Sequence, residues 1–162
     1  SRGLGDVYKR QMFMLLSYIS LPDEVKLLAN ESMGHAVLSS LFVYGYEYEC
    51  VTRIDNGDII GFALYHKHAI GKYRVGVIDC VCVSIPYRES GVGAELFFAV
   101  LKKMGDVDRV ETTVHIPRSI DTWPGIPVCG NTDFLTRLGF REVVGSTMED
   151  DEWKKCVYAI DH

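Results

Sequence analysis

The residues best suited by type and spacing to bind a ligand form a glycine-spaced turn, RESGVG, at positions 88–93. After this turn, apolar residues from Ala94 to Met104 recur at helical spacing, so the glycines are expected at the N-terminus of a helix. The first backbone N–H groups of a helix have no partner within it, and the helix dipole adds partial positive charge there. Glycine also lets a ligand approach the backbone closely, so the turn is predicted to hold a phosphate group.

A single charged residue, Asp79, interrupts the apolar segment that precedes this turn. Residues 75–83, VGVIDCVCV, are otherwise apolar or β-branched, as is typical of a central strand covered on both faces. Side chains two positions apart on a strand share a face, so Asp79 is expected beside Val77, Val81 and Val83. A lone charge in such a strand indicates either a catalytic role or a specific bonding partner.

Two common nucleotide-binding motifs are excluded by spacing. The chain contains no G-x-x-x-x-G-K-[ST] segment, which is the loop that binds nucleoside triphosphates. The dinucleotide fingerprint G-x-G-x-x-G needs a different glycine spacing from the R-x-x-G-x-G found here. An ordinary structural turn between a strand and a helix remains the alternative for this motif.

A second motif lies at residues 131–140, which read NTDFLTRLGF. Together with R-x-x-G-x-G, it resembles the GNAT superfamily of acyl-coenzyme A-dependent N-acyltransferases. In that family, [QR]-x-x-G-x-[GA] follows the fourth strand and holds the coenzyme A pyrophosphate, and an asparagine opens a later short helix that ends in Gly-Phe. The resemblance covers about residues 73–140 and implies acetyl-CoA as cosubstrate.

The resemblance implies a specific set of residues for coenzyme A. Backbone groups at the end of the strand would hold pantetheine and polarise the thioester, while the turn would surround the pyrophosphate with N–H groups. The residues so assigned are Val81, Cys82, Val83, Arg88, Glu89, Ser90, Gly91, Val92, Gly93, Ala94, Asn131 and Phe134.

The resemblance also makes Asp79 the candidate catalytic residue. Similar family members place a general-base glutamate on this strand, and Asp79 matches it in register although its side chain is one methylene shorter. The alternative is a buried aspartate bonded to backbone or to a basic neighbour. The family's usual general acid is a tyrosine at the position of Leu135, which leaves water, Tyr87, His115 or Tyr158 for that role.

Composition predicts one soluble globular domain without a nucleic-acid surface. The chain has 162 residues, of which 48% are hydrophobic and 24% charged, and its formal net charge is −5. This charge disfavours a broad basic face and favours a cationic acceptor. Residues 1–11 show no periodic pattern and are expected to be a non-native or disordered leader, so 12–162 are expected to form a single GNAT-like N-acetyltransferase domain.

Cysteine and histidine spacing predicts neither a metal site nor disulfides. The five cysteines form no C-x-x-C pair, so reduced thiols and a cytoplasmic location are expected. Cys80 and Cys82 are expected on opposite faces of one strand. His66 and His68 are expected to face solvent. The apolar run at 12–21 is too short to span a bilayer, so no membrane partner is expected.

The elements that must position these residues predict an α/β (α+β) fold with a mixed central sheet and helices on both faces. Asn56-Gly57 predicts a tight hairpin turn. Strands are expected at 13–20, 46–54, 59–68, 75–83, 109–116, 140–146 and 153–160, and helices at 22–30, 32–40, 94–104 and from Asn131. The resulting order, β-α-α-β-β-β-α-β-α-β-β, is that of the GNAT fold.

These observations predict an enzyme that transfers an acetyl group from acetyl-CoA to a primary amine of a small molecule or peptide. Leu135 and the short acid at Asp79 also allow a catalytically silent acyl-CoA-binding regulatory domain. A third interpretation is an interaction domain whose glycine turn is only structural. The acids Glu149, Asp150, Asp151 and Glu152 favour a cationic acceptor, with a solvated loop as the alternative, and a homodimer is left open.

Overall fold

The computed structural model describes residues 22–32, 48–117, 132–149 and 153–162. The strand expected at 13–20, most of the helix expected at 32–40 and the leader at 1–11 lie outside these residues. Asn131, the acids at 150–152 and the side chain of His115 also lie outside them.

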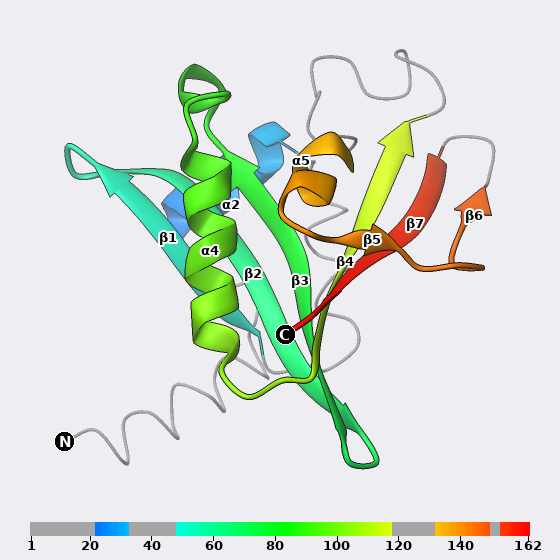
Figure 1. Cartoon of the computed structure of the whole chain (residues 1–162). Coiled ribbons are helices and arrows are strands. Elements are labelled where there is room, and N and C mark those ends of the chain that lie inside the picture. Colours follow the sequence, from blue (N-terminus) through cyan, green and yellow to red (C-terminus); the bar gives the residue numbers. More distant parts are fainter. Residues whose placement is uncertain (1–21, 33–47, 118–131, 150–152) are drawn as a thin grey trace, which may run out of the picture.

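A mixed sheet forms the centre of the described structure (Figure 1). Its seven strands follow the order β1-β2-β3-β4-β7-β5, with β6 paired to β7. Strands β3 and β4 run parallel, and the other described pairs are antiparallel. The strands are β1 (Glu49–Asp55), β2 (Asp58–Ile70), β3 (Tyr73–Val83), β4 (Arg109–Pro117), β5 (Arg141–Glu142), β6 (Met148–Glu149) and β7 (Trp153–Asp161).

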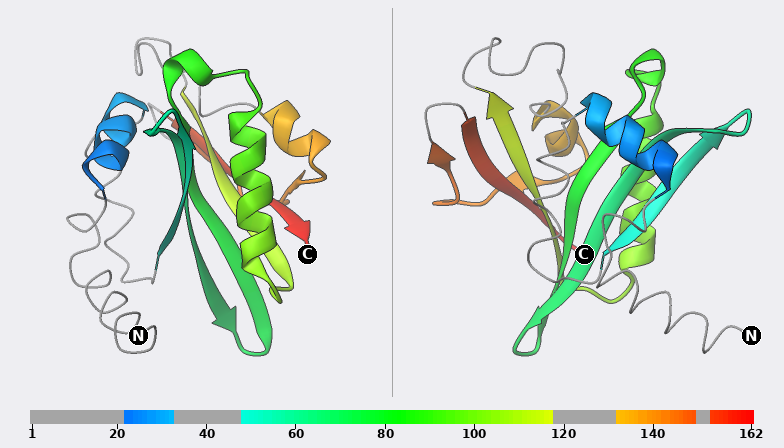
Figure 2. Two further views of the ribbon diagram at one scale, coloured as in Figure 1. Left: turned by 90° about the vertical axis from the view of Figure 1, so that its left-hand side faces the viewer. Right: turned by 180° about the vertical axis from the view of Figure 1, so that it is seen from behind.

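Helices cover both faces of this sheet, as the sequence predicts (Figure 2). Helix α2 (Asp23–Ser32) packs on β2 and β3 from one side, while α4 (Val92–Met104) packs on β1, β2 and β3 from the other. The short helix α5 (Thr132–Arg137) lies on the α4 side, where Phe134 meets Phe97 edge to face. A single helical turn, η2 (Ile85–Tyr87), joins β3 to α4.

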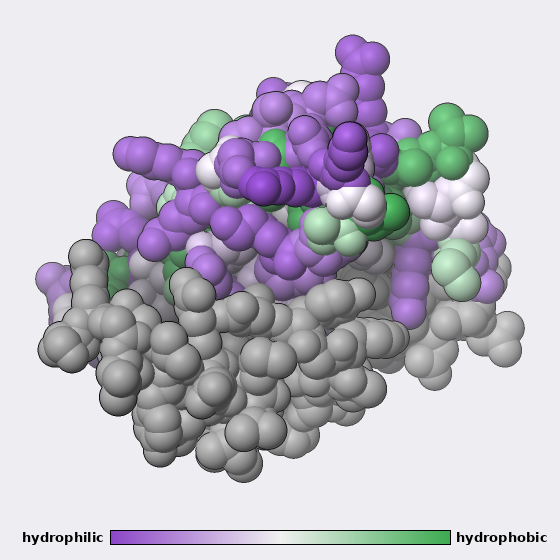
Figure 3. All heavy atoms as spheres, turned by 90° about the horizontal axis from the view of Figure 1, so that it is seen from below, coloured by the Kyte–Doolittle hydropathy of each residue, from purple (hydrophilic) through white to green (hydrophobic). Residues whose placement is uncertain are grey.

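Each face carries its own apolar cluster. The α2-side cluster consists of Val25, Leu28, Ala29, Phe62, Leu64 and Cys82, with Cys50, Ile59 and Cys80 packed against it. The larger α4-side cluster includes Ile78, Leu96, Phe97, Val100, Met104 and Val110, with Val81 and Val83 packed against it. The surface seen in Figure 3 is mainly hydrophilic over the described residues, with small hydrophobic areas.

Local sequence signals for the hairpin and the central helix are confirmed. Asn56 and Gly57 have φ values of 49° and 83°, the left-handed geometry that a two-residue hairpin turn requires. Helix α4 begins at Val92, two residues before the expected start. The strand expected at 140–146 was wrong in extent: a turn at Val143 to Ser146, with Gly145 at φ 79°, ends β5 after Glu142.

Candidate active site

Strands β3 and β4 pair along only part of their length. The parallel ladder joins residues 75–78 of β3 to residues 109–112 of β4, and within the described strands it extends no further. Beyond this point β3 remains paired to β2 as far as Val83, and β4 remains paired to β7 as far as Pro117. The two strands therefore diverge from Ile78 and Thr112 onward, as Figure 1 shows.

Asp79 lies at the point where the pairing ends, and it is the extra residue of a β-bulge. Leu64 pairs with Cys80, but Tyr65 pairs with Ile78, so Asp79 has no partner residue on β2. The extra residue of such a bulge shifts the in–out alternation of side chains by one position, so side chains on its two sides no longer follow one continuous alternation. Asp79 consequently faces the α2 side, where its carboxylate meets His66.

Two expectations about shared faces were wrong, and the bulge accounts for the first of them. Asp79 does not share a face with Val81 and Val83, because these two valines pack against the α4-side cluster. Cys80 and Cys82 are not on opposite faces, since both contribute to the α2-side cluster. Residues two positions apart on one strand share a face, which is the simpler rule that applies to this cysteine pair.

His66 forms a close polar contact with Asp79. Its Nδ1 lies 2.7 Å from Asp79 Oδ2, and the two side chains are 5% and 10% exposed. The expectation that His66 faces solvent was wrong, because His66 follows Phe62 and Leu64 in the alternation of β2 and shares their buried face. That alternation was the sequence signal that would have located it.

The surroundings of Asp79 have two opposite effects on the pKa of its carboxyl group. Burial raises the pKa of Asp79, because a charged carboxylate loses hydration inside the protein. The hydrogen bond and charge of His66, together with the charge of His68, lower it, but burial is the larger effect. The pKa of Asp79 is therefore higher than usual, which makes its ionised carboxylate a stronger base than that of an exposed aspartate.

The turn between β3 and α4 has the geometry of an anion-binding site. Gly91 caps α4 at φ 90°, and a side-chain carbon added to it would meet nothing within 4 Å. The same carbon at Gly93 would touch only Val83, at 3.8 Å. The backbone N–H groups of the first helical turn have no intrahelical partner, so this open turn presents donors to an anion.

Arg88 is held by the backbone of the preceding strand. Its Nε donates a hydrogen bond to the carbonyl oxygen of Val83 at 3.0 Å, and the hydroxyl of Ser90 donates to the carbonyl oxygen of Tyr87. Glu89 adopts φ 63°, which directs the chain back towards the helix. Arg88 and Ser90 thus shape the turn, in addition to any contact that they make with a ligand.

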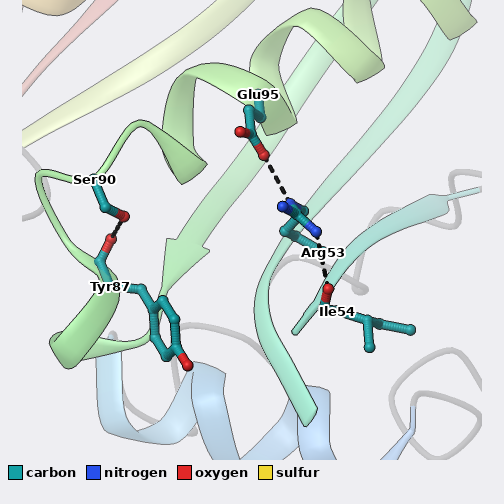
Figure 4. A network of polar contacts seen from close by, with 5 residues as sticks. All are labelled: Arg53, Ile54, Tyr87, Ser90 and Glu95. Carbon is teal, nitrogen blue, oxygen red and sulfur yellow. Dashed lines mark hydrogen bonds and ion pairs between the residues drawn. The ribbon is translucent and has the colours of Figure 1, made fainter. Parts of the chain in front are cut away.

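The tip of the β1–β2 hairpin supports this turn from outside (Figure 4). Arg53 Nε lies 2.7 Å from Glu95 Oε2 in the first turn of α4, and Arg53 also donates to the carbonyl oxygen of Ile54. The hydroxyl of Tyr87 donates to Asp55 at 3.0 Å. Arg53 and Glu95 are half exposed, so their ion pair orients the turn without adding much stability.

The remaining expected residues fall into two groups. Val81, Cys82 and Val83 lie on the part of β3 that β4 leaves unpaired, so their backbone groups are at the point where the strands diverge. Phe134 packs on Phe97 of α4.

Leu135 and Tyr158, which bear on the general-acid role, belong to the core or its edge. Leu135, which stands where the family has a tyrosine, is buried in the α4-side cluster. Tyr158 packs against the same cluster, and burial raises the pKa of its hydroxyl.

Two further features of the described residues bear on function. They contain no group of three or more His, Cys, Asp or Glu side chains arranged to hold a metal ion. None of the described helices has both the length and the apolar character needed to cross a membrane. A shallow pocket lined by Lys67, Arg74 and Asp106 lies towards the other end of β2 and β3 from the turn, and His68 also lines it.

Solved structures with a similar fold are found among acetyltransferases. A GNAT-family protein from Desulfovibrio desulfuricans is 17% identical, with 91% of this chain and 87% of that chain covered and a TM-score of 0.58. An aminoglycoside 6'-N-acetyltransferase in complex with coenzyme A is 12% identical, with 86% and 89% covered and a TM-score of 0.62. A GNAT acetyltransferase from Elizabethkingia anophelis with acetyl-CoA bound is 13% identical, with 83% and 88% covered and a TM-score of 0.58.

The family itself is established by the sequence. Comparison with curated proteins gives no significant match. Residues 23–122, which are more than half of the 162-residue chain, match the acetyltransferase (GNAT) family. The divergent parallel strands, the glycine turn and the family match agree, and the chain belongs to the GNAT family of acetyltransferases.

Proposed function

We propose that this protein is an N-acetyltransferase that transfers the acetyl group of acetyl-CoA to a primary amine, with Asp79 as general base. One observation carries the proposal: β3 places a buried carboxylate where its pairing with β4 ends and an anion-binding turn at its C-terminal end. A proton acceptor and a phosphate site on one strand are what acyl transfer from coenzyme A requires.

The residues of this chain fit coenzyme A in two respects. The open turn at Gly91 and Gly93 has room for a pyrophosphate beside the N–H groups that open α4. The unpaired edge of β3 at Val81 to Val83 offers backbone donors and acceptors to the amides of pantetheine. Two structural neighbours that contain coenzyme A or acetyl-CoA support this assignment.

Asp79 has a definite role in the proposed reaction. Acetyl-CoA supplies an acyl group activated as a thioester, so the amine forms the new C–N bond while the C–S bond breaks. The ionised carboxylate of Asp79 accepts the proton that the amine nitrogen loses. Asp79 then returns this proton to solvent or to the departing thiolate, and its pKa, raised by burial, makes it a better acceptor than an exposed aspartate.

The missing tyrosine at Leu135 is compatible with this reaction. A thiol has a pKa of about 8.5, so the thiolate of coenzyme A leaves readily near neutral pH without a strong general acid. Leu135 is part of the core and offers no proton. The same replacement motivates the second candidate function, an acyl-CoA-binding regulator without catalysis.

Two measurements test the proposal. Calorimetry with coenzyme A and acetyl-CoA tests the cosubstrate, and release of free thiol with a panel of small-molecule and peptide amines tests the transfer. Binding together with amine-dependent thiol release is expected. Binding without thiol release for any amine would favour the regulator, and absence of binding would contradict both. The cytoplasmic location, the single domain over 12–162 and a homodimer remain predictions.

A further inference from the structure

We propose that His66 is the positioning residue for the Asp79 base, and that its Nδ1 keeps the Asp79 carboxylate ionised and fixed in orientation where β3 and β4 diverge. This inference rests on the proposed function, because it concerns the residue that we assign as general base. His66 lies on β2, outside both sequence motifs that point to acetyl transfer.

The first support is the geometry of the pair. The 2.7 Å contact between Nδ1 and Oδ2 is short for a hydrogen bond and is typical of one that involves a charged group. An ionised carboxylate only accepts, so with Asp79 ionised Nδ1 carries the hydrogen and donates it. This contact uses Oδ2, so the other carboxylate oxygen of Asp79 is the one assigned to the proton of the amine.

The second support is that the bulge on β3 brings the pair together. Regular alternation counted back from Val81 would direct Asp79 to the α4 side, among apolar residues such as Ile60 and Tyr65. The extra residue instead directs it to the face of His66, which is opposite Val77 in the ladder. A bulge at this position therefore selects the bonding partner of the base.

The third support is that the His66 ring is held by its neighbours. Tyr48 meets it edge to face at a centroid distance of 5.3 Å, and His68 stacks on it at 5.6 Å. Tyr48 is itself 4% exposed. A donor confined in this way fixes the direction of the carboxylate that it holds, which is what a precise catalytic geometry needs.

The other titratable groups around this pair do not replace His66. Among the described residues, those on this face are Glu24 and Lys26 on α2, Tyr48 and Cys50 at β1, His68 on β2, Cys80 and Cys82 on β3, and Arg109 and Glu111 on β4. Burial raises the pKa of Cys50 to about 12, while a hydrogen bond with Cys82, together with burial, raises the pKa of Cys80 well above its usual value. Both thiols are therefore neutral near pH 7. Arg109 and Glu111 lie 3.2 Å apart and largely balance each other, while Lys26 lies 4.0 Å from Asp23.

Under this inference, only Asp79 gains and loses a proton during the reaction. The Nδ1 hydrogen stays on His66 throughout, while Asp79 gains the amine proton and then loses it. His66 opposes the effect of burial on the pKa of Asp79, because its hydrogen bond favours the ionised carboxylate. Loss of His66 is therefore expected to raise the pKa of Asp79 further.

Two substitutions separate this role from simple packing. His66→Phe keeps a ring but removes the donor, whereas His66→Asn keeps an N–H donor and removes the ring. His162→Asn is the control, because His162 is an exposed histidine at the end of the chain that contacts the carbonyl oxygen of Leu101. The pKa of Asp79 is measured by NMR of its carboxyl carbon in the free proteins, and the pH profile of kcat/KM is measured with the best amine.

The expected result is a shift in pH dependence. In His66→Phe, the pKa of Asp79 and the acidic limb of kcat/KM should both move up by about 1–2 pH units. His66→Asn should show a smaller shift in the same direction, and His162→Asn none, with coenzyme A affinity unchanged in all three. An Asp79 pKa that is the same in wild type and His66→Phe would overturn the inference.

The experiment remains decisive if one arm fails. Should His66→Phe not fold, an unshifted Asp79 pKa in His66→Asn overturns the inference, and a raised one supports it. The NMR titration needs no activity, so a wild type that releases no thiol would contradict the proposed function while the carboxyl pKa still decides the role of His66.

Discussion

At the scale of single residues, the proposed chemistry depends on how the Asp79 carboxyl group is held in a position that is 10% exposed. A carboxylate that is taken out of water needs a charged or hydrogen-bonding partner, and here His66 provides it at 2.7 Å. The sequence allowed either a catalytic aspartate or a buried aspartate bonded to a basic neighbour. The structure gives Asp79 such a neighbour, and the two interpretations are compatible because a positioned base needs a partner.

Replacement of Asp79 tests its catalytic role directly. Asp79→Asn keeps the size of the side chain but cannot accept a proton, so we expect kcat to fall by about 10²–10⁴-fold with coenzyme A affinity nearly unchanged. Asp58→Asn is the matched control, since Asp58 is an exposed aspartate that opens β2. Steady-state thiol release and calorimetry give the two quantities, and wild-type turnover in Asp79→Asn would leave Asp79 with a structural role only.

The raised pKa of Asp79 also predicts how stability depends on pH. A carboxyl whose pKa is higher in the folded than in the unfolded protein binds protons more tightly when folded, so its contribution to stability decreases as pH rises above about 3.8. Wild type should therefore lose stability relative to Asp79→Asn as the pH rises from about 4, until the pH exceeds the raised pKa of Asp79. Urea unfolding of both proteins across this range measures the difference, which should not change with pH if burial leaves the carboxyl pKa unaltered.

At the scale of elements, two features link β3 to α4: a packing contact near the start of β3 and the glycine turn that joins the end of β3 to α4. Near the start of β3, Gly76 lies against Met104, the last residue of α4, which is fully buried. At the far end, Gly91 begins the same helix beside the anion-binding turn. The packing at one end fixes the position of the helix and hence of the N–H groups at the other.

The packing contact near the start of β3 can be tested by adding one methyl group. A Cβ at Gly76 would lie 2.4 Å from the sulfur of Met104, so Gly76→Ala should lower the free energy of unfolding by about 1–3 kcal/mol. Gly93→Ala adds the same group at an ordinary 3.8 Å contact and should be neutral or stabilising. Chemical denaturation compares the two, and equal stability would show that Met104 moves aside at little cost.

The glycine turn at the N-terminus of α4 is tested by a pair of charged substitutions. Gly91→Glu places a side chain and a negative charge where the pyrophosphate is proposed to bind, so coenzyme A binding should be abolished. Gly105→Glu is the matched control, because Gly105 also has a positive φ, of 66°, and open space around it, but caps the other end of α4. Both variants should lose stability, Gly105→Glu more so because its ψ of −115° lies outside the left-handed helical region, and unchanged coenzyme A affinity in folded Gly91→Glu would contradict the site.

At the scale of the whole molecule, electrostatics favours cationic acceptors. The net charge of −5 attracts cations over about 8–10 Å before physiological salt screens it. Glu149 is exposed on β6 beside Lys154 of β7, and the neighbouring acids at 150–152 lie outside the described residues. The charge thus supports a cationic amine as acceptor, while a solvated acidic loop is the alternative.

A salt titration distinguishes these two alternatives. We expect kcat/KM for a polycationic amine to fall several-fold between low and high salt, because screening removes the long-range attraction. An amine with a neutral body should change little, and serine at positions 149–152 should reduce the difference between the two amines. If the polycation shows no preference that salt or serine removes, the acidic loop has no part in acceptor choice.

The sequence by itself determined the local features of this protein. Apolar patterning located the longer described strands, helical spacing located α4, and Asn56-Gly57 located the hairpin, because each depends on residues close together in the chain. The R-x-x-G-x-G turn was found from spacing for the same reason, and the short helix before Gly-Phe was expected from the resemblance to the GNAT family. These features were sufficient to predict the GNAT family and to single out Asp79.

Only the tertiary structure decided which side chain Asp79 meets. The bulge that turns it from the side of Val81 to the side of His66 arises from the register between two strands, and no local pattern specifies where that register slips. The divergence of β3 from β4 likewise depends on β4 following β7 instead. Alternation along one strand predicts which residues share a face, but contact between a base and its positioning residue depends on pairing between strands.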